Sequence, residues 1–303
     1  MKTFKGRTAV ITGAASGFGL EASRIAARLG MNIVMADIQR DALDTAAAAL
    51  AALGATVLPF QLDVAKADDV EALAAATFAR FGAPHVVFNN AGVGAGGLIW
   101  ETTLKDWEWV VGVNLMGVAH GIRVFTPMML AAAAQEADYE GHVVNTASMA
   151  GLLNAPNMGV YNATKSAVVA ISETLYHDLK LVTERISASV LCPFFVPTGI
   201  ARSQRNRPAD MQNASGEMTR SQRIGQAMSA RAVGSGKVSA AEVAQLVFDA
   251  IAERRFYVYS HPRLLANVHL RLDDIEASRN PADPFAHMPE LGHDLRARLR
   301  AAD

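Results

Sequence analysis

Tyr161 and Lys165, with Ser148 upstream of them, are the side chains in this sequence best suited to chemistry. Tyrosine is a weak acid or base at neutral pH because its ordinary pKa is about 10. A lysine at the i+4 position of a helix lies on the same face, and its charge would favour tyrosinate and lower that pKa. The Ser148 hydroxyl can hold a substrate oxygen beside the phenol. These residue types predict proton transfer to or from an alcohol or carbonyl oxygen.

A glycine-rich segment, Thr12-Gly13-Ala14-Ala15-Ser16-Gly17-Phe18-Gly19, lies between an apolar run and a helical pattern. Glycines allow a tight turn and the close approach of a pyrophosphate to a helix N-terminus, where free N–H groups favour anions. The spacing Gly-x-x-x-Gly-x-Gly differs from the Gly-x-Gly-x-x-Gly of most dinucleotide folds, and glycine clusters also form plain turns. The position between strand and helix favours a dinucleotide site. Its candidate residues are Gly13, Ser16, Gly17, Phe18 and Gly19.

Further candidates follow the next predicted strands. Asp37 ends the second strand, where a carboxylate can accept hydrogen bonds from both ribose hydroxyls of NAD and would repel the 2′-phosphate of NADP. It could also cap the following helix, and the nearby Arg40 leaves NADP open. Small and polar residues after the third and fourth strands can border a cofactor or simply form turns. They are Asp63, Val64, Asn90, Ala91 and Gly92.

The elements that must position these residues alternate between strand and helix. Continuous apolar strands separated by helices indicate a parallel sheet covered on both faces. A bend is expected at Pro127 of a long helix, and Asn114 in the same helix is a mediocre helix former that needs partners if buried and could kink the helix and hold a water. Strands are expected at 8–11, 32–36, 56–62, 85–88, 142–145, 186–191 and 256–259, and helices at 20–29, 42–53, 68–80, 104–134, 158–183 and 240–253.

The composition excludes several other classes of protein. A formal net charge of −1 gives no reason to expect a nucleic acid or a membrane surface as partner. Cys192 is the only cysteine, so an internal disulfide and a multi-cysteine metal site are excluded, and its place at the end of an apolar strand favours a structural thiol. No apolar run approaches the roughly 18 residues of a membrane span. We expect a cytoplasmic protein with no metal.

Two segments depart from the alternating pattern. Residues 199–236 hold six arginines but only Asp210 and Glu217 as acids. This segment follows the sixth strand, so it should leave the sheet at the carboxyl edge, where ligands bind. We expect either a lid that becomes ordered through ligand contacts or a solvated surface insertion. Residues 261–303 are polar and are expected to be an extension of one domain at 1–260.

Five elements, in the same order, resemble the short-chain dehydrogenase/reductase family. The likeness covers residues 7 to about 260. It implies an α/β fold of the Rossmann type, with a doubly wound sheet of seven parallel strands in the order 3-2-1-4-5-6-7 and helices on both faces. The matching elements are Thr12–Gly19, Asn89–Gly92, Asn114, Ser148 and Tyr161–Lys165.

The resemblance also implies a role for each catalytic candidate. Tyr161 would be the general acid/base, and Ser148 would position the substrate oxygen. Lys165 would bind the nicotinamide ribose and lower the tyrosine pKa, and Asn114 would hold a water of a proton relay. The implied cofactor contacts are Gly13, Gly17, Gly19, Asp63, Asn90, Val196 and Thr198.

One departure from the family lies after the sixth strand. The family often has Pro-Gly there, whereas this chain has Pro193-Phe194 followed by Phe195. Loss of the glycine puts the local backbone path in doubt and adds aromatic surface near the nicotinamide.

The sequence therefore predicts an oxidoreductase that interconverts a secondary alcohol and a ketone with NAD, or less expectedly NADP. Apolar residues in 93–98 and 149–158, with the two phenylalanines, suggest a hydrophobic or aromatic substrate. The alternative is a sensor or scaffold that binds dinucleotide without turnover. A homo-oligomer, either tetramer or dimer, is expected, and Trp100, Trp107 and Trp109 are expected to be packing residues.

Overall fold

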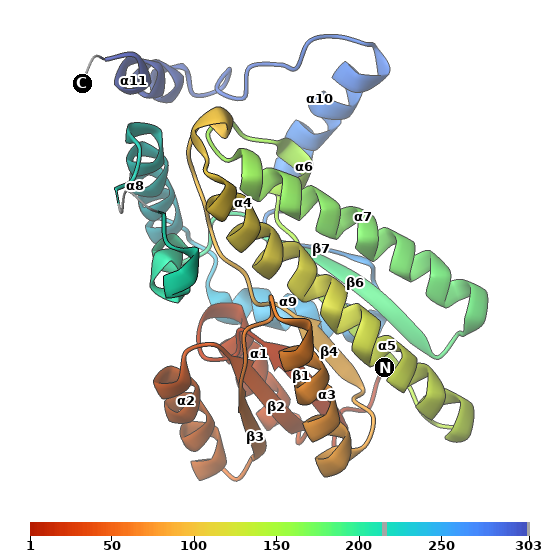
Figure 1. The fold of residues 1–303 in the computed structure, drawn as a ribbon. Helices are drawn as coiled ribbons and strands as arrows, with labels where there is room; N and C mark the ends of the chain where they lie inside the picture. The colour runs from red at the N-terminus through yellow and green to blue at the C-terminus, as the bar shows by residue number, and fades with distance from the viewer. Residues whose placement is uncertain (214–216, 302–303) are drawn as a thin grey trace.

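The computed structural model describes residues 1–213 and 217–301. A seven-stranded sheet forms its centre, with the order β3-β2-β1-β4-β5-β6-β7 and every neighbouring pair parallel (Figure 1). The expected fold class and strand order are confirmed. The strands are β1 Thr8–Thr12, β2 Asn32–Asp37, β3 Thr56–Gln61, β4 Val86–Asn89, β5 Gly141–Thr146, β6 Ile186–Cys192 and β7 Tyr257–Tyr259.

Side chains of the central strands alternate between two apolar layers. Ile11 of β1 packs in the layer of α1, α2 and α9, whereas Val10 packs in the layer of α3, α5 and α7. Both faces of the sheet are therefore covered, which explains why its strands read as continuous apolar runs. The helices are α1 Gly17–Arg28, α2 Arg40–Ala52, α3 Ala67–Phe81, α5 Gly117–Gln135, α7 Gly159–Val182 and α9 Ala240–Glu253.

A π-helical turn interrupts the long helix before α5. Helix α4 spans Leu104–Val111, and the turn η2, Gly112–Met116, contains the fully buried Asn114. Helix α5 continues past Pro127, and the π-helical irregularity lies at Asn114, where a kink was also expected. By length and composition alone, the helical stretch Leu104–Gln135 could cross a membrane. In the structure, 39% of its most apolar 18-residue stretch is buried inside the protein. Its Phe125 and Met129 pack into the core, as in the core helices of many globular proteins.

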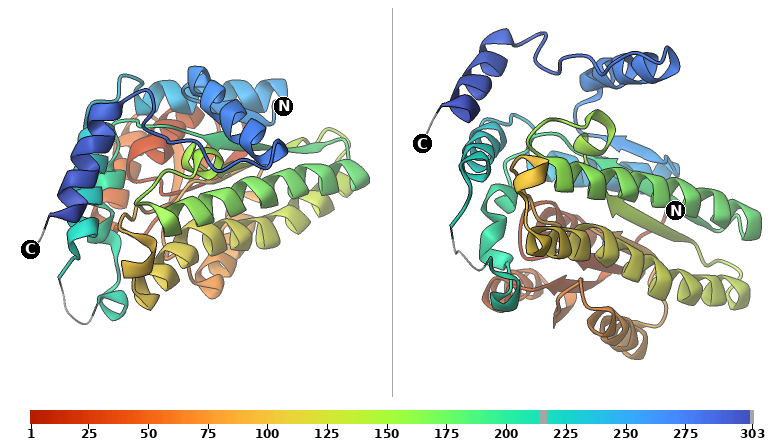
Figure 2. Two further views of the ribbon diagram at one scale, coloured as in Figure 1. Left: turned by 90° about the horizontal axis from the view of Figure 1, so that it is seen from above. Right: turned by 45° about the horizontal axis from the view of Figure 1, so that its top comes forward.

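The residues after β6 form more structure than the sequence predicted. We call residues 199–213 and 217–236 the lid segment; it holds η3 Gly199–Asn206, η4 Ala209–Met211 and helix α8 Arg220–Gly234. The C-terminal extension also forms helices, and Figure 2 shows the last of them lying along α8. The remaining elements are η1 Ile99–Glu101, α6 Ala150–Leu153, η5 Pro262–Leu264, α10 Leu265–Glu276 and α11 Pro289–Arg300.

Candidate active site

One large cleft lies at the carboxyl ends of the strands, where the loops after β1 to β6 converge. Its volume is about 2070 Å³, which exceeds the several hundred to ~1,000 Å³ of a typical single-ligand pocket. Most of the predicted site residues line this cleft, while Gly19, Asn114 and Lys165 lie behind its wall. The lining ones are Gly13, Ser16, Gly17, Phe18, Asp37, Asp63, Val64, Asn90, Ala91, Gly92, Ser148, Tyr161, Pro193, Val196 and Thr198.

The glycine turn between β1 and α1 has no room for side chains. A Cβ on Gly19 would lie 2.2 Å from the carbonyl oxygen of Gly13, and Gly13 itself has φ +65°. Asn90 fixes the turn from β4, because its Nδ2 donates to the Thr12 carbonyl oxygen at 2.9 Å. Ser16, the residue before α1, makes no capping side-chain bond, and the first turn of α1 carries no acidic residue. The helix N-terminus therefore presents its N–H groups to the cleft, as an anion site requires.

Asp37 at the end of β2 lies beside this turn. Its Oδ2 accepts from the Ala15 N–H and its Oδ1 from the Gln39 N–H, both at 3.0 Å. A carboxylate has about four acceptor positions, so two hydrogen bonds leave capacity for ribose hydroxyls. Gln39 precedes α2, yet its own side chain makes no capping bond; the Asp37 carboxylate therefore stabilises the start of this helix and lines the cleft at once.

The next strand exit places Asp63 and Val64 in the cleft wall. The Asp63 Oδ1 accepts from the Ala65 N–H at 3.0 Å, and its own N–H donates to the Asp69 carboxylate at 2.9 Å. Val64 is packed closely enough that a Cβ on Gly117 would meet its Cγ2 at 2.8 Å. These bonds form the turn that the sequence suggested, and they hold both residues at the cleft.

Ser148 and Tyr161 meet at the centre of the cleft, from the loop after β5 and the first turn of α7. The Ser148 Oγ accepts from the Ala150 N–H at 3.1 Å and donates to the Pro193 carbonyl oxygen at 3.3 Å. Burial raises the pKa of Tyr161, and the hydrogen bond with Ser148 acts in the opposite direction. The phenol is therefore protonated at neutral pH in this structure.

Lys165 lies one helical turn behind Tyr161, and its side chain is almost entirely buried. Its Nζ donates to the Thr146 carbonyl oxygen at 2.7 Å and lies 5.8 Å from the centre of the Tyr161 ring. Burial lowers the pKa of Lys165 to about 8. Lys165 is not among the groups that shift the Tyr161 pKa, so the expected lowering of that pKa is not seen. The ammonium group is directed to a main-chain oxygen instead.

Asn114 ties the π-helical turn to the loop after β4. Its Oδ1 accepts from the Val93 N–H at 2.8 Å, and its Nδ2 donates to the Val93 carbonyl oxygen at 3.0 Å and to Thr164 Oγ1 at 3.3 Å. A Cβ on Gly92 would lie 3.4 Å from Asn114 Oδ1 and 3.5 Å from Lys165 Nζ. The loop after β4, η2 and α7 therefore meet around Gly92, and the Asn114 amide acts as a loop anchor.

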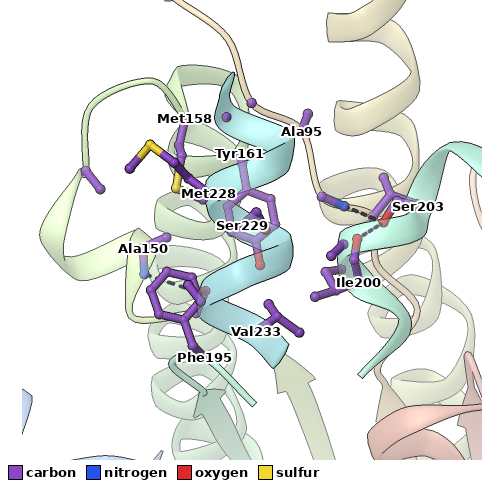
Figure 3. A pocket seen from close by; sticks show the side chains of 18 of the residues that line it. Ala95, Ala150, Met158, Tyr161, Phe195, Ile200, Ser203, Met228, Ser229 and Val233 are labelled. Atoms are coloured by element: carbon purple, nitrogen blue, oxygen red, sulfur yellow. Dashed lines mark hydrogen bonds between the residues drawn. The ribbon is translucent and has the colours of Figure 1, made fainter. Parts of the chain in front are cut away.

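The part of the cleft beside Tyr161 is lined mainly by apolar side chains. Figure 3 shows Met158 and Phe195 from the body and Met228, Ser229 and Val233 from α8 around the same pocket. The rings of the two phenylalanines after Pro193 lie tilted against each other with centroids 4.3 Å apart, and the Phe194 N–H donates to Ser260 Oγ at 3.0 Å. This contact supports the backbone where the glycine of the family is missing, and both phenylalanines line the cleft.

The structure bears on the cysteine and the tryptophans, which the sequence suggested were structural residues. Cys192 is buried, and burial raises the pKa of its thiol to about 12, which agrees with a structural thiol. Trp109 is 3% exposed and packs in a buried cluster, as expected. Trp100 is 77% exposed, so it is not a packing residue in the single chain.

Sequence reasoning placed residues 199–236 at the ligand edge of the sheet, but it missed that α8 forms there and that the extension also lines the cleft. Met228 and Val233 come from α8, and Leu264 and Leu270 come from the C-terminal extension. One available signal was the capping box formed by Thr219 and Gln222, which marks the start of α8. The weak apolar periodicity of the segment concealed the helix that follows.

The comparisons with known proteins agree with this geometry. Residues 7–209 match the family model described as short chain dehydrogenase. A dehydrogenase/reductase of CLA biosynthesis from Lactiplantibacillus plantarum is 33% identical over 86% of this chain and 90% of its own. The 1-deoxy-11-beta-hydroxypentalenate dehydrogenase of Streptomyces exfoliatus is 34% identical over 89% and 88%, respectively. A crystal structure of a short chain dehydrogenase/reductase from Burkholderia phymatum in complex with NAD shares 52% sequence identity with this chain at a TM-score of 0.90. The match covers 94% of this chain and 99% of the Burkholderia chain.

Proposed function

Because this chain belongs to the short-chain dehydrogenase/reductase family, we propose that it is an NAD-dependent oxidoreductase that interconverts a secondary alcohol and a ketone. The observation that carries the proposal is the placement of Tyr161 and Ser148 in one cleft with the glycine turn. This reaction needs a proton-transfer group and a dinucleotide site in one cavity, and Tyr161 and the glycine turn line the same cleft.

The cleft fits a dinucleotide. The N-terminus of α1 would hold the pyrophosphate, and the Asp37 carboxylate would accept hydrogen bonds from the adenosine ribose. Arg40, which left NADP open in the sequence, forms an ion pair with Asp44 at 2.6 Å on the exposed side of α2 and does not line the cleft. A 2′-phosphate would therefore meet the Asp37 charge without Arg40 in the cleft wall to offset it, which favours NAD.

The residues around Tyr161 would move the proton of the reaction. In the reducing direction, the Tyr161 hydroxyl donates its proton to the carbonyl oxygen, which the Ser148 hydroxyl holds by a hydrogen bond. When bound, nicotinamide would supply the hydride to the carbonyl carbon. Lys165 would hold the ribose of the cofactor and return a proton toward Tyr161. The Asn114 side chain is already bonded to Val93 and Thr164, so a relay water would bind main-chain groups of η2.

The substrate is proposed to be a hydrophobic or aromatic alcohol or ketone. Met158, Phe195, Met228 and Val233 surround the place where its oxygen would meet Tyr161. Burial of a bulky apolar group there would contribute about 25 cal/mol of favourable binding free energy per Å² of apolar surface removed from water.

The test measures NADH binding by its fluorescence and then turnover with a panel of aryl and alicyclic alcohols and ketones. We expect binding of NADH and turnover of at least one apolar pair. Binding without turnover of any member would support the alternative, a sensor or scaffold that binds dinucleotide. We propose that the protein is cytoplasmic. Recovery of the expressed chain with the membrane fraction would contradict this location.

A further inference from the structure

The buried carboxylate of Asp106 on α4 accepts hydrogen bonds from three different parts of the lid segment. Its Oδ1 accepts from Arg207 Nη1 at 2.7 Å and from Asn213 Nδ2 at 3.2 Å, and its Oδ2 accepts from Gln222 Nε2 at 3.1 Å. The side chains of Asp106 and Arg207 are 8% and 3% exposed. Arg207 follows η3, Asn213 follows η4, and Gln222 lies in α8, so one group joins all three elements to α4.

The arginine of this group is itself held on every side. Its Nε donates to the Met211 carbonyl oxygen at 2.7 Å and its Nη2 to Asn213 Oδ1 at 3.0 Å. The guanidinium lies 5.1 Å from the centre of the Trp109 ring, also on α4. Removal of one partner of a buried ion pair strongly destabilises a protein, because it leaves an uncompensated buried charge. Removal of Asp106 would leave Arg207 buried without its counter-charge.

The Asp106 carboxylate also belongs to the body of the protein. Its Oδ2 accepts from the Thr103 N–H at 2.9 Å and forms the capping box at the start of α4. Burial acts to raise the pKa of Asp106, but the hydrogen bonds from Thr103, Arg207 and Asn213 outweigh burial, and the net pKa lies below its ordinary value. The group is therefore charged at neutral pH, as an ion pair with Arg207 requires.

Two further contacts join α8 to η1 and to the loop after β4. The Ser221 Oγ accepts from the Leu98 N–H at 2.9 Å and donates to Glu101 at 2.6 Å. In the middle of α8, a Cβ on Gly225 would lie 3.4 Å from the Gly96 Cα and 2.8 Å from Asn157 Nδ2. Helix α8 thus rests directly on the backbone of the loop after β4. Small shifts at Asp106 would separate these close surfaces.

From this geometry we infer that Asp106 is a positioning residue, which holds α8 against the body and so places Met228, Ser229 and Val233 in the substrate cleft beside Tyr161. Asp106 acts through the lid segment and need not touch the reacting atoms. The lid segment is then ordered by the protein's own side chains, so ligand contacts are not the only source of its order. The part of the inference that concerns substrate rests on the proposed function.

The test compares three variants. Asp106→Ala removes the shared acceptor. Gln222→Glu keeps an oxygen for the capping bond with Thr219 but places a second carboxylate against Asp106, and it serves if Asp106→Ala does not fold. Glu71→Ala is the matched control, because Glu71 also joins two elements through an arginine, Arg123 at 2.7 Å, but both side chains are more than half exposed.

The first measurement is hydrogen exchange, which does not depend on the reaction. In Asp106→Ala and Gln222→Glu we expect protection of the amides in 220–234 to fall at least tenfold, with β4 and β5 unchanged. Glu71→Ala should match the wild type in both regions. Unchanged protection of α8, or an equal loss in β4 and β5, would overturn the inference.

The second measurement is steady-state kinetics with an apolar ketone and NADH. We expect the KM for the ketone to rise at least tenfold, kcat to change less than threefold, and the Kd for NADH to change less than twofold. A fall in kcat with an unchanged KM would contradict the positioning role. If the wild type reduces no ketone, the proposed function fails, while the exchange result still decides whether Asp106 holds α8.

Discussion

At Lys165 a charged group has been taken out of water, and this is expected to cost stability. The side chain is 2% exposed, and burial lowers its pKa from 10.5 to about 8. The unfolded chain therefore binds more protons than the folded chain between these values, so stability rises with pH across that window. Below pH 8 the full penalty of burial is present.

Replacement of this lysine should therefore stabilise the fold while it removes activity. We expect Lys165→Met to raise the free energy of unfolding at pH 7 by about 1–3 kcal/mol, after the lost bond to Thr146 is counted. The gain should shrink as the pH rises towards 10.5. Urea unfolding at a series of pH values measures it. A variant no more stable than the wild type at pH 7 would contradict the burial penalty.

The proposed proton transfer depends on a single hydroxyl group, that of Tyr161. Tyr161→Phe removes the hydroxyl and keeps the ring, so kcat should fall by about 10²–10⁴-fold while NADH binding is retained. Tyr176→Phe is the control; this tyrosine packs on Phe256, outside the cleft, and its replacement should leave kcat unchanged. If Tyr161→Phe kept more than about a tenth of wild-type kcat, Tyr161 would not be the general acid/base.

Cofactor choice is expected to depend on the Asp37 carboxylate. Asp37→Ala should lower kcat/KM for NAD much more than for NADP, because it removes ribose hydrogen bonds and the repulsion of a 2′-phosphate together. Asp41→Ala, in the exposed first turn of α2, should change kcat/KM neither for NAD nor for NADP. A wild-type preference for NADP would contradict the proposed role of Asp37.

Individual site residues could be identified from the sequence, but their partners could not. The order of the glycine turn, Asn114, Ser148 and the Tyr161/Lys165 pair carried the candidates. The direction of the Lys165 ammonium group could not be read from i, i+4 spacing, because the Thr146 carbonyl that accepts its hydrogen bond belongs to strand β5 and not to the same helix. Thr103 and Asp106 have the spacing of a capping box, but nothing in the sequence links Asp106 to Arg207, which lies 101 residues away.

At the scale of elements, close backbone contacts position the site. Helix α6 presses on α7 so tightly that a Cβ on Gly151 would lie 2.6 Å from the carbonyl carbon and oxygen of Lys165. We expect Gly151→Ala to lower the free energy of unfolding by about 1–3 kcal/mol through overpacking, and to reduce activity by displacing Lys165.

The matched control for Gly151 lies at the end of α8. A Cβ on Gly234 would have nothing within 4 Å, so Gly234→Ala should leave stability unchanged or raise it slightly. Thermal unfolding of both variants gives the comparison. Equal effects of the two substitutions would show that helix propensity, and not the α6–α7 contact, determines the result.

The sheet and its covering helices were predictable because each buries an apolar face. Strands β1 and β4 are buried at every residue, and their sequences contain the short apolar runs Ala-Val-Ile and Val-Val-Phe. Helix α8 escaped prediction because its buried residues are Ser221, Gln222 and Val233, only one of them apolar. A helix held by hydrogen bonds and by a close contact at Gly225 leaves no apolar stripe in its sequence.

At the scale of the whole molecule, the single chain leaves part of its helical layer uncovered. Helix α7 exposes Ala163, Ala170 and Thr174 along one face, and small residues permit close packing of helices. At the edge of the sheet, the short strand β7 exposes Tyr257. Unpaired strand edges and small-residue helix faces are surfaces that a second copy of the chain can cover by two-fold symmetry.

We therefore predict a homo-oligomer, a tetramer or a dimer, in which the helices at 104–135 and 159–182 pair across one interface and α9 with β7 across another. Light scattering at micromolar concentration should give a mass that is a multiple of 32.2 kDa. Ala170→Glu should reduce that mass, because it places a charge on the exposed face of α7. Ala51→Glu, an exposed helical alanine in the opposite layer, should not change it. A wild-type species of 32 kDa alone would remove the prediction, and an oligomer unaffected by Ala170→Glu would place the interface elsewhere.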